Sequence, residues 1–270
     1  MRAASLQLER GFTILELMVA TSIFLVLCAA MFGLLQLSQQ RYSSETQLSG
    51  AFQETRLAID QIARDFNVSG YPAESIFSKL PADTTQYAQT PVAWSPNYPV
   101  SPCFVGTAGG GTCATPGDFD LIVETDLGNG VSWIRYQLNG TTLFRAVVPK
   151  AAGTDPAVAT SAAGAMVPFL TNVMNNVMST PSAGLLTQIT AAYPAMFPGG
   201  VAQPVFKYTC DTPSGLQPCP SLTAGNNGVP ANIRDVDITL IVMTRQPDLQ
   251  TQQLKLVELN GRGHRVNPSN

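Results

Sequence analysis

The sequence predicts an α+β fold in which one long N-terminal helix packs, through its outer half, on a mostly antiparallel β-sheet with long loops. The first indication is an apolar run near the N-terminus that continues, without a proline, into the periodic pattern of an amphipathic helix. The second is a series of short downstream segments with the alternating pattern of strands, two of them joined across Asn139-Gly140. A helix laid on one face of a sheet buries the apolar surfaces of both.

The apolar run is long enough to cross a bilayer. It carries no charge between Leu17 and Leu35, and about 20 such residues span a hydrocarbon core of roughly 30 Å. Glu16 stands at its start. An ionisable side chain in such a segment is unfavourable by up to about 3 kcal/mol at mid-bilayer, and by less near an end, so Glu16 suggests a function. Because Arg2 and Arg10 precede the run, the N-terminus is expected in the cytoplasm and the remainder outside it.

The second half of the helix has an amphipathic pattern. Apolar and small side chains recur at alternating steps of four and three, which places on one face Leu48, Phe52, Thr55, Ile59, Ile62 and Phe66. Gly70 and Pro72 end the pattern. One helix is therefore expected over residues 12–66, roughly 80 Å long at a rise of about 1.5 Å per residue.

Five segments predict strands. They are residues 118–126, 131–138, 141–148, 204–210 and 234–244. The Asn-Gly turn between the second and the third is the strongest short-range hairpin signal. Aromatic side chains of these segments are expected in the sheet core or in cross-strand pairs, namely Trp133, Tyr136 and Phe144.

Two long segments separate these elements. Residues 73–116 are irregular and rich in Pro, Ser and Thr, and residues 151–204 are rich in Ala, Gly, Pro and Thr. A helix is expected around 167–178 within the second segment.

The composition argues against several classes of function. The formal net charge of −3 does not fit a nucleic-acid-binding surface, and no cofactor is expected. The chain has a single histidine, His264, and both Ser-His-Asp and Cys-His catalysis require a histidine, so such catalysis is not favoured. The segment AGGGTC at residues 108–113 lacks the Gly-Lys-Ser/Thr of a phosphate loop. We therefore expect no enzymatic activity.

The cysteines favour disulfides over a metal site. One lies in the apolar run and four lie downstream in two close pairs: Cys28, then Cys103 with Cys113 and Cys210 with Cys219. Four cysteines in an exported region indicate two disulfides, and of three possible pairings the local one is simplest. Metal ligation usually needs CxxC spacing or histidine partners. No metal is therefore expected.

Two pairs of acidic residues stand two positions apart on predicted strands. They are Asp118 with Asp120, and Asp235 with Asp237. Calcium ligation is one interpretation, and a solvated strand face is the favoured one.

Three interpretations of the N-terminus leave Glu16 without a role. A secretory signal is one, with LCAAM at residues 27–31 as a cleavage site. A lipoprotein signal would use Cys28, but the bulky Leu27 before it is unsuitable. A plain membrane anchor tolerates Glu16 without using it.

The segment GFTILELMVATSIF, residues 11–24, closely resembles the signal of type IV pilins and pseudopilins. The resemblance implies a pilin-like fold, cleavage by prepilin peptidase between Gly11 and Phe12, and methylation of the new amino terminus at Phe12. It makes Glu16 the fifth residue of the mature chain, where the family places a glutamate. A negative charge is favourable in the first turns of a helix. The amino terminus of a neighbouring subunit's Phe12 is the expected cationic partner of Glu16, which makes Glu16 an assembly contact.

Downstream segments resemble W-type minor pilins and the J-type minor pseudopilins of type II secretion. The segments are QIARDFNVSGYP, YQLNGTTLFRAV, and PVFKYT followed by IRDVDITLIV. The family's usual proline within the first helix is absent, and Gly33 lies in that neighbourhood. The two long loops have no counterpart in the resemblance.

The resemblance implies three parts. Residues 1–11 are a leader peptide, 12–36 a transmembrane and filament-core helix, and 37–270 a periplasmic globular domain that includes the amphipathic half of the helix at 37–66. The expected function is that of a minor pilin at the filament tip that helps to start assembly. Other minor and major pilins are the expected partners. The protein is expected in the inner membrane first and then in a cell-surface or periplasmic filament. A minor pseudopilin, or a membrane-anchored or secreted binding protein, are the alternatives.

Overall fold

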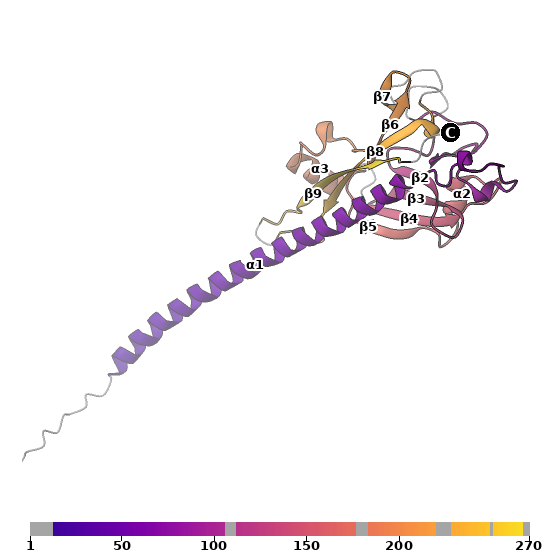
Figure 1. The fold of residues 1–270 in the computed structure, drawn as a ribbon. Helices are drawn as coiled ribbons and strands as arrows, with labels where there is room; N and C mark the ends of the chain where they lie inside the picture. The colour runs from indigo at the N-terminus through magenta and orange to yellow at the C-terminus, as the bar shows by residue number, and fades with distance from the viewer. Residues whose placement is uncertain (1–12, 106–111, 177–182, 220–227, 249–250, 267–270) are drawn as a thin grey trace, which may run out of the picture.

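The computed structural model describes residues 13–105, 112–176, 183–219, 228–248 and 251–266. One long helix carries the globular domain on its C-terminal part, and its N-terminal half projects away from the domain (Figure 1). This arrangement is the α+β architecture that the sequence predicts.

Helix α1 (Ile14–Asn67) is a single continuous element. Thr13 caps its start and Val68 caps its end, beyond which Gly70 adopts a φ of 78° that favours glycine. The expected helix over residues 12–66 is therefore confirmed from residue 14 onward, and residue 12 lies outside the described residues.

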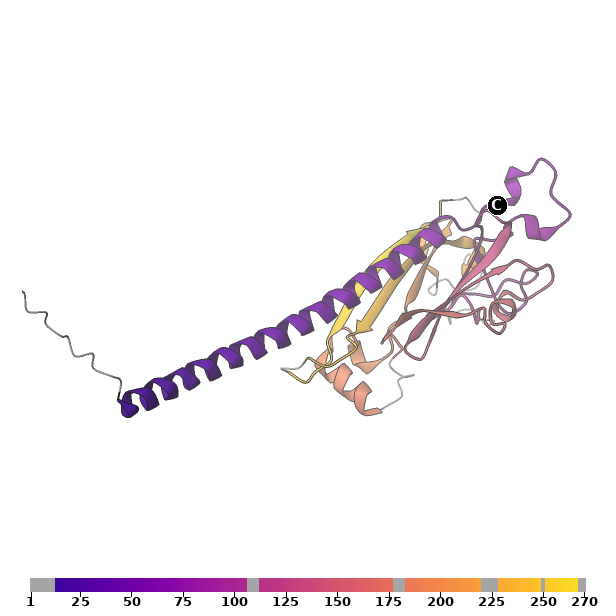
Figure 2. The same cartoon turned by 90° about the horizontal axis from the view of Figure 1, so that it is seen from below.

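The strands form two antiparallel sheets, where the sequence predicts one. The first has the order β1 (Val92–Ala93), β2 (Asp120–Asp126), β3 (Val131–Asn139), β4 (Thr142–Pro149) and β5 (Val167–Thr171). The second has the order β7 (Gly215–Pro218), β6 (Phe206–Thr212), β8 (Ile233–Met243) and β9 (Leu256–His264). Figure 2 shows the two sheets diverging, with α1 along the second.

Helical segments among the described residues are short apart from α1. Two are α-helices, α2 (Pro156–Thr160) and α3 (Ala183–Ala192). Four are single 3₁₀ turns, η1 (Glu74–Ile76), η2 (Thr84–Gln86), η4 (Pro198–Gly200) and η7 (Pro230–Asn232).

The β3–β4 hairpin turns at the predicted Asn-Gly pair. Asn139 pairs with Thr142 next to the turn, and Gly140 has a φ of 60°. The predicted aromatic core is also present in part, because Trp133 and Tyr136 are fully buried. Phe144 is only half-buried.

The helix predicted around 167–178 is wrong. Its first residues form β5, which pairs with β4 at the edge of the first sheet, where Pro168 is tolerated because an edge strand needs fewer ladder hydrogen bonds. Val173 then pairs with Val242 of β8, so the chain passes from one sheet to the other. Residues 177 and 178 lie outside the described residues.

The two sheets meet where β2 begins and β6 begins. The N–H groups of Val205 and Phe206 donate to the carbonyl of Asp118, at 2.8 and 3.0 Å. The Tyr208 hydroxyl donates to the carbonyl of Gly117 at 2.8 Å. These hydrogen bonds join the two sheets through backbone carbonyl groups of a loop. Because backbone carbonyls are common to all residues, the sequence has no pattern that predicts them.

Helix α1 buries its last three turns mainly against β8 and β9. Its Asp65 also binds the first sheet, because it accepts from the Tyr136 hydroxyl at 2.6 Å and from the Arg145 guanidinium at 2.8 Å. Its buried residues are Thr55, Ala58, Ile59, Ile62, Asp65 and Phe66. The inward-facing row of β8 consists of Val236, Ile238, Leu240 and Val242, each at most 2% exposed. Phe52 was expected on the packed face but is 42% exposed, because the closest packing begins one turn later.

Strand β9 has no clear sequence signal because glycine is a poor strand former. Gly261 pairs with Ile238 and Gly263 with Val236, so both glycines face α1. A Cβ atom at Gly261 would lie 2.1 Å from Cγ2 of Ile59, and one at Gly263 would lie 2.9 Å from Cδ1 of Phe66. Because these two positions carry no side chain, the helix can approach the backbone of β9 closely.

Gly263→Val is expected to lower the free energy of unfolding by about 1–3 kcal/mol, because the added side chain overlaps the buried Phe66 ring. Denaturant unfolding of the full chain in detergent, followed by circular dichroism, measures the loss. Glu258→Val is the control, since Glu258 lies on the exposed face of the same strand and should be nearly neutral. Equal stability of both variants would contradict a tight helix–strand contact.

Candidate functional site

The first turn of α1 holds the carboxylate of Glu16 in place. The Thr13 backbone N–H and the Thr13 hydroxyl both donate to Oε2 of Glu16, at 3.0 and 3.1 Å. In return the Glu16 backbone N–H donates to the Thr13 hydroxyl at 3.2 Å. This reciprocal pair is a capping box, which satisfies helix N–H groups that have no partner within the helix.

The capping box orients Glu16 without neutralising it. Within the described part of the chain its hydrogen bonds go to Thr13 alone, and the side chain is exposed. An ionised carboxylate beside a lipid-like surface needs a cation, and no described residue of this chain supplies one. Gly11 and Phe12, the predicted cleavage and methylation residues, lie outside the described residues.

The N-terminal half of α1 exposes a continuous apolar surface. Between Ile14 and Leu35 the large apolar side chains are each at least 52% exposed: Ile14, Leu15, Leu17, Met18, Val19, Ile23, Phe24, Leu25, Val26, Leu27, Met31, Phe32, Leu34 and Leu35. By length and composition, α1 is the one described helix able to cross a membrane. The predicted apolar segment is thus held outside the domain as an accessible surface.

Polar side chains in the apolar half are satisfied within the helix. The Thr21 hydroxyl donates to the Leu17 carbonyl at 2.9 Å, and the Ser22 hydroxyl donates to the Val19 carbonyl at 2.8 Å. Such bonds to the preceding turn let hydroxyl groups enter an apolar medium. The helix also continues through Gly33, around which a Cβ atom would meet nothing within 4 Å.

Both predicted disulfides are present with the local pairing. Cys103 and Cys113 are joined by an S–S bond of 2.02 Å, and Cys210 and Cys219 by one of 2.08 Å. The second bond ties β6 to the end of β7. Cys28 is a free thiol. The described residues contain no group of three or more His, Cys, Asp or Glu side chains placed to hold a metal ion.

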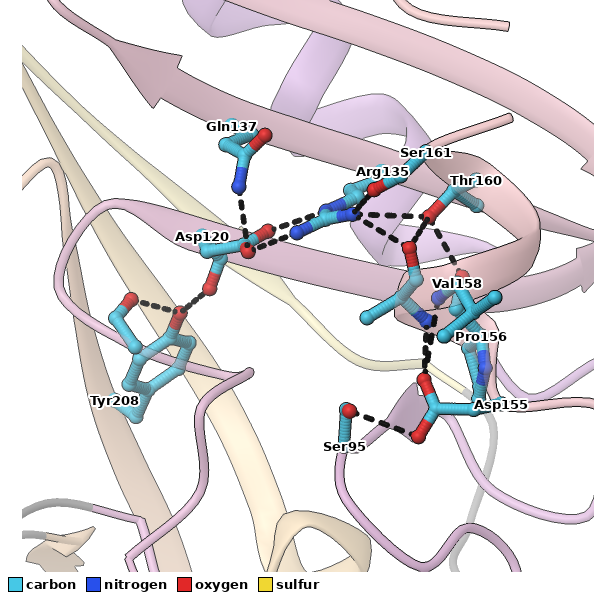
Figure 3. Close-up of polar contacts among 12 residues, drawn as sticks. Ser95, Asp120, Arg135, Gln137, Asp155, Pro156, Val158, Thr160, Ser161 and Tyr208 are labelled. Carbon is cyan, nitrogen blue, oxygen red and sulfur yellow. Dashed lines mark hydrogen bonds and ion pairs between the residues drawn. The ribbon is translucent and has the colours of Figure 1, made fainter. Parts of the chain in front are cut away.

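The prediction of a solvated acidic face on β2 is wrong for Asp120. Figure 3 shows the Arg135 guanidinium against the Asp120 carboxylate, with Nε to Oδ1 at 2.9 Å and Nη2 to Oδ2 at 2.6 Å. Burial raises the pKa of Asp120, and Arg135 opposes that rise. Arg135 also donates to the Ala157 carbonyl at 2.9 Å and so fixes α2 on the sheet. Asp118, by contrast, is exposed as predicted.

The prediction of a solvated face is likewise wrong for one residue of the second acidic pair, Asp235 with Asp237. Asp235 is buried and accepts from Arg262 at 2.6 Å, and it contacts Nδ1 of His264 at 2.5 Å. Asp237 is half-exposed and lies 3.5 Å from the Arg262 guanidinium. His264 and Arg262 of β9 therefore both bind the Asp235 carboxylate.

A buried ion pair anchors the loop before β2. Glu124 is fully buried and contacts the Lys150 ammonium, whose Nζ also donates to the Tyr87 carbonyl at 3.0 Å. The Tyr98 hydroxyl donates to the other oxygen of Glu124, and the Gln89 N–H donates to the first at 2.9 Å. Burial raises the pKa of Glu124, while Lys150 opposes the rise. All these partners come from the chain itself, which indicates a structural role.

Comparison with known proteins identifies the N-terminus. Residues 6–32 match the family model described as the prokaryotic N-terminal methylation motif. No curated protein and no solved structure matches the chain. The motif marks the type IV pilin and pseudopilin superfamily and implies processing by prepilin peptidase.

The N-terminal segment is therefore that of a type IV pilin-like protein, a structural class that is generally not enzymatic. Its apolar helix is consistent with a place in the inner membrane before assembly. The cap formed by Thr13 has a signal in the sequence, because Thr and Glu three residues apart before an apolar run are the capping-box pattern. The Glu124–Lys150 pair has none, since its partners meet only in the folded sheet.

Lys150→Met is expected to lower the free energy of unfolding by about 3–5 kcal/mol at neutral pH, because it strands the buried carboxylate of Glu124. The folded-state pKa of Glu124 then rises further above the ordinary value of 4.5. Protonation of Glu124 consequently favours the folded state, so the loss should shrink as the pH falls through that raised pKa. Denaturant unfolding across pH measures both effects.

Two controls separate the stranded charge from other effects of losing a lysine. Adding Glu124→Gln to Lys150→Met removes that charge, and it should flatten the pH dependence. Lys207→Met changes an exposed lysine of β6 and should alter the free energy of unfolding by less than about 0.5 kcal/mol. A Lys150→Met variant as stable as Lys207→Met would contradict the structural role of the pair.

Proposed function

We propose that the chain is a minor pilin subunit of a type IV pilus, acting at the filament tip and helping to start assembly. The observation that carries the proposal is the oriented carboxylate of Glu16 at the start of an exposed apolar helix. A plain anchor needs the apolar surface but not the charge. A subunit that must recognise another helix end uses both.

The proposal includes a topology and a processing step. Prepilin peptidase cuts between Gly11 and Phe12 on the cytoplasmic side, and the new amino terminus at Phe12 is methylated. Residues 12–36 span the inner membrane, and the domain of residues 37–270 lies in the periplasm until the subunit enters a filament. The match over residues 6–32 covers this cleavage region and supports the step.

In assembly, Glu16 pairs with the Phe12 amino group of a neighbouring subunit. Thr13 occupies Oε2 of Glu16 and fixes its direction, so the incoming amine meets a preorganised acceptor. Desolvation of two charges in an apolar core is offset only when they pair with good geometry. The exposed apolar side chains of α1 supply the surrounding helix contacts.

The shape of the domain supports a place at the tip. The first sheet extends sideways from α1, and the loop carrying η1 and η2 projects at the end of the molecule remote from the N-terminus (Figure 2). Lateral and distal bulk is accommodated most easily where no subunit stacks above. The partners are then other minor pilins below the tip, followed by the major pilin.

A minor pseudopilin of type II secretion is the alternative within the same class, and a membrane-anchored or secreted binding protein is the alternative outside it. The mature N-terminus separates the classes. Methyl-phenylalanine at Phe12 supports a filament subunit, whereas a mature chain that begins near Met31 supports a secreted protein.

Gly11→Val is expected to leave the precursor uncut, because a peptidase pocket that accepts glycine has no room for a branched side chain. Immunoblotting of the membrane fraction and mass spectrometry of the N-terminus detect the uncut form. Ala4→Val, which adds comparable bulk elsewhere in the leader, should be processed normally. Mature protein from Gly11→Val at the wild-type level would overturn the cleavage assignment.

Glu16→Ala is expected to be cleaved and inserted in the membrane, yet to lose its partner minor pilins in pull-down and to produce fewer filaments. The reason is that the Phe12 amine of the neighbour is left uncompensated in an apolar setting. Glu16→Gln keeps an oxygen that accepts from Thr13 but carries no charge, so it should fail similarly.

Two variants test whether the charge or the helix cap matters. Thr13→Ala removes the capping hydroxyl, at a cost to the helix of about 0.5–2 kcal/mol, and keeps the charge of Glu16. It should assemble better than Glu16→Gln. Glu45→Ala removes an exposed glutamate from the outer half of the same helix and should assemble normally. Normal assembly of Glu16→Ala, or wild-type protein along the whole filament at the abundance of the major subunit, would contradict the proposal.

A further inference from the structure

The face of the domain nearest the apolar half of α1 is lined by uncharged side chains around a groove. It consists of the exposed side of α3, residues 187–193, with the adjoining residues 247–248 and 251–254, and is called the underside here. A groove of about 620 Å³ runs between the two parts, lined by Gln188, Ala191, Tyr193, Pro247, Gln252 and Leu254 among others.

Hydrogen bonds fix the underside at a defined height along α1. The Ser44 hydroxyl donates to Oδ2 of Asp248 at 2.7 Å, and Nζ of Lys255 donates to the Ser44 hydroxyl at 2.9 Å. The Tyr193 hydroxyl at the end of α3 donates to the Leu254 carbonyl at 3.1 Å. The loop is therefore level with Ser44, and α3 rests against the loop.

The sequence of α1 indicates where lipid headgroups lie. Arg41 is the first charged residue after Glu16, and Tyr42 beside it is 74% exposed. Arginine and tyrosine at the end of an apolar span mark the membrane–water interface. Ser44 lies three positions beyond Arg41, which is about 4.5 Å along a helix. Ser44 is also eight positions, or about 12 Å, beyond residue 36 at the end of the proposed span. Since each headgroup layer is about 5–7 Å thick, the underside of an upright molecule begins about 5–7 Å above that layer.

The underside is chemically suited to that position. Residues 156–206 contain no charged side chain. Ile189 of α3 is buried in a core cluster with Met174 and Phe197, which leaves Gln188, Ala191 and Ala192 outward. Asp248 and Lys255 form an ion pair of 2.6 Å, so they add no net charge. Little charge has to be desolvated when such a face meets an interface.

We propose that the underside rests on the lipid headgroups around the membrane-spanning helix while the subunit is unassembled, with the groove beside α3 open to the interfacial layer. A helix tilt of about 20°, usual for membrane spans, brings one side of the domain down to the surface. The inference requires only that α1 crosses the bilayer. It does not depend on a minor pilin role or on Glu16, so failure of either leaves it standing.

A tryptophan probe tests the contact in the full chain reconstituted in phosphatidylcholine–phosphatidylglycerol nanodiscs. The native Trp94, just after β1, and Trp133 of β3 are buried in one core cluster and provide a constant background. Gln188→Trp places an indole on α3, and Val158→Trp places one at an equally outward position of α2, at the other end of the domain. With lipids brominated near the headgroup, the added emission of Gln188→Trp should be largely lost and that of Val158→Trp retained.

A second measurement avoids the affinity of an added indole for interfaces. Methyl resonances of Ala191 and Ala192 are compared with those of Ala151 and Ala152, which are also exposed, in nanodiscs that contain headgroup nitroxide lipids. Broadening confined to Ala191 and Ala192 supports the contact. Equal broadening of both pairs, or Gln188→Trp emission quenched no more than that of Val158→Trp, would overturn it, and the groove would then face a protein partner or water.

Discussion

The close approach of α1 to β9 is the contact on which the rest of the structure depends. Gly261 and Gly263 remove the side chains that would otherwise hold the helix off the strand, and Ile59 and Phe66 fill the space that they leave. Helix α1 then covers one face of β8 and β9 in the second sheet. The first sheet is attached to α1 by Asp65, which accepts from Tyr136 and Arg145. It is attached to the second sheet by Val173, just after β5, and by the loop carbonyls at the start of β2.

Buried ion pairs hold α2 and a loop against the first sheet, as hydrophobic packing holds α1 against the second. Arg135 joins β3 to α2 through Asp120, and Lys150 joins the end of β4 to the loop that precedes β2 through Glu124. A domain with so few charged residues places several of them inside, where an unpaired member is strongly unfavourable. These pairs hold long loops that have little regular secondary structure of their own.

Features of the fold that follow from neighbouring residues were predictable from the sequence. Helix α1 ends at Asn67, shortly before Gly70, and the β3–β4 hairpin turns at Asn139-Gly140. The cysteines form disulfides that close short loops. Contacts between distant residues were not. The sequence pattern around 167–178 fits a helix as well as a strand, and only pairing with β4 decides for the strand. For the candidate site, Glu16 stands out as a charge in an apolar run, whereas the burial of Asp120 depends on Arg135 from another strand.

The continuity of α1 has a mechanical consequence. Its 54 residues form a rod of about 81 Å, with one end in the apolar segment and the other fixed in the sheets. Gly33 does not interrupt it, so the rod has no marked hinge at the boundary between the two halves. A tilt of about 10° at the apolar end displaces the far end by about 14 Å, given that length. The domain therefore changes its orientation together with the helix. Any force that turns the apolar end is transmitted directly to the projecting loops.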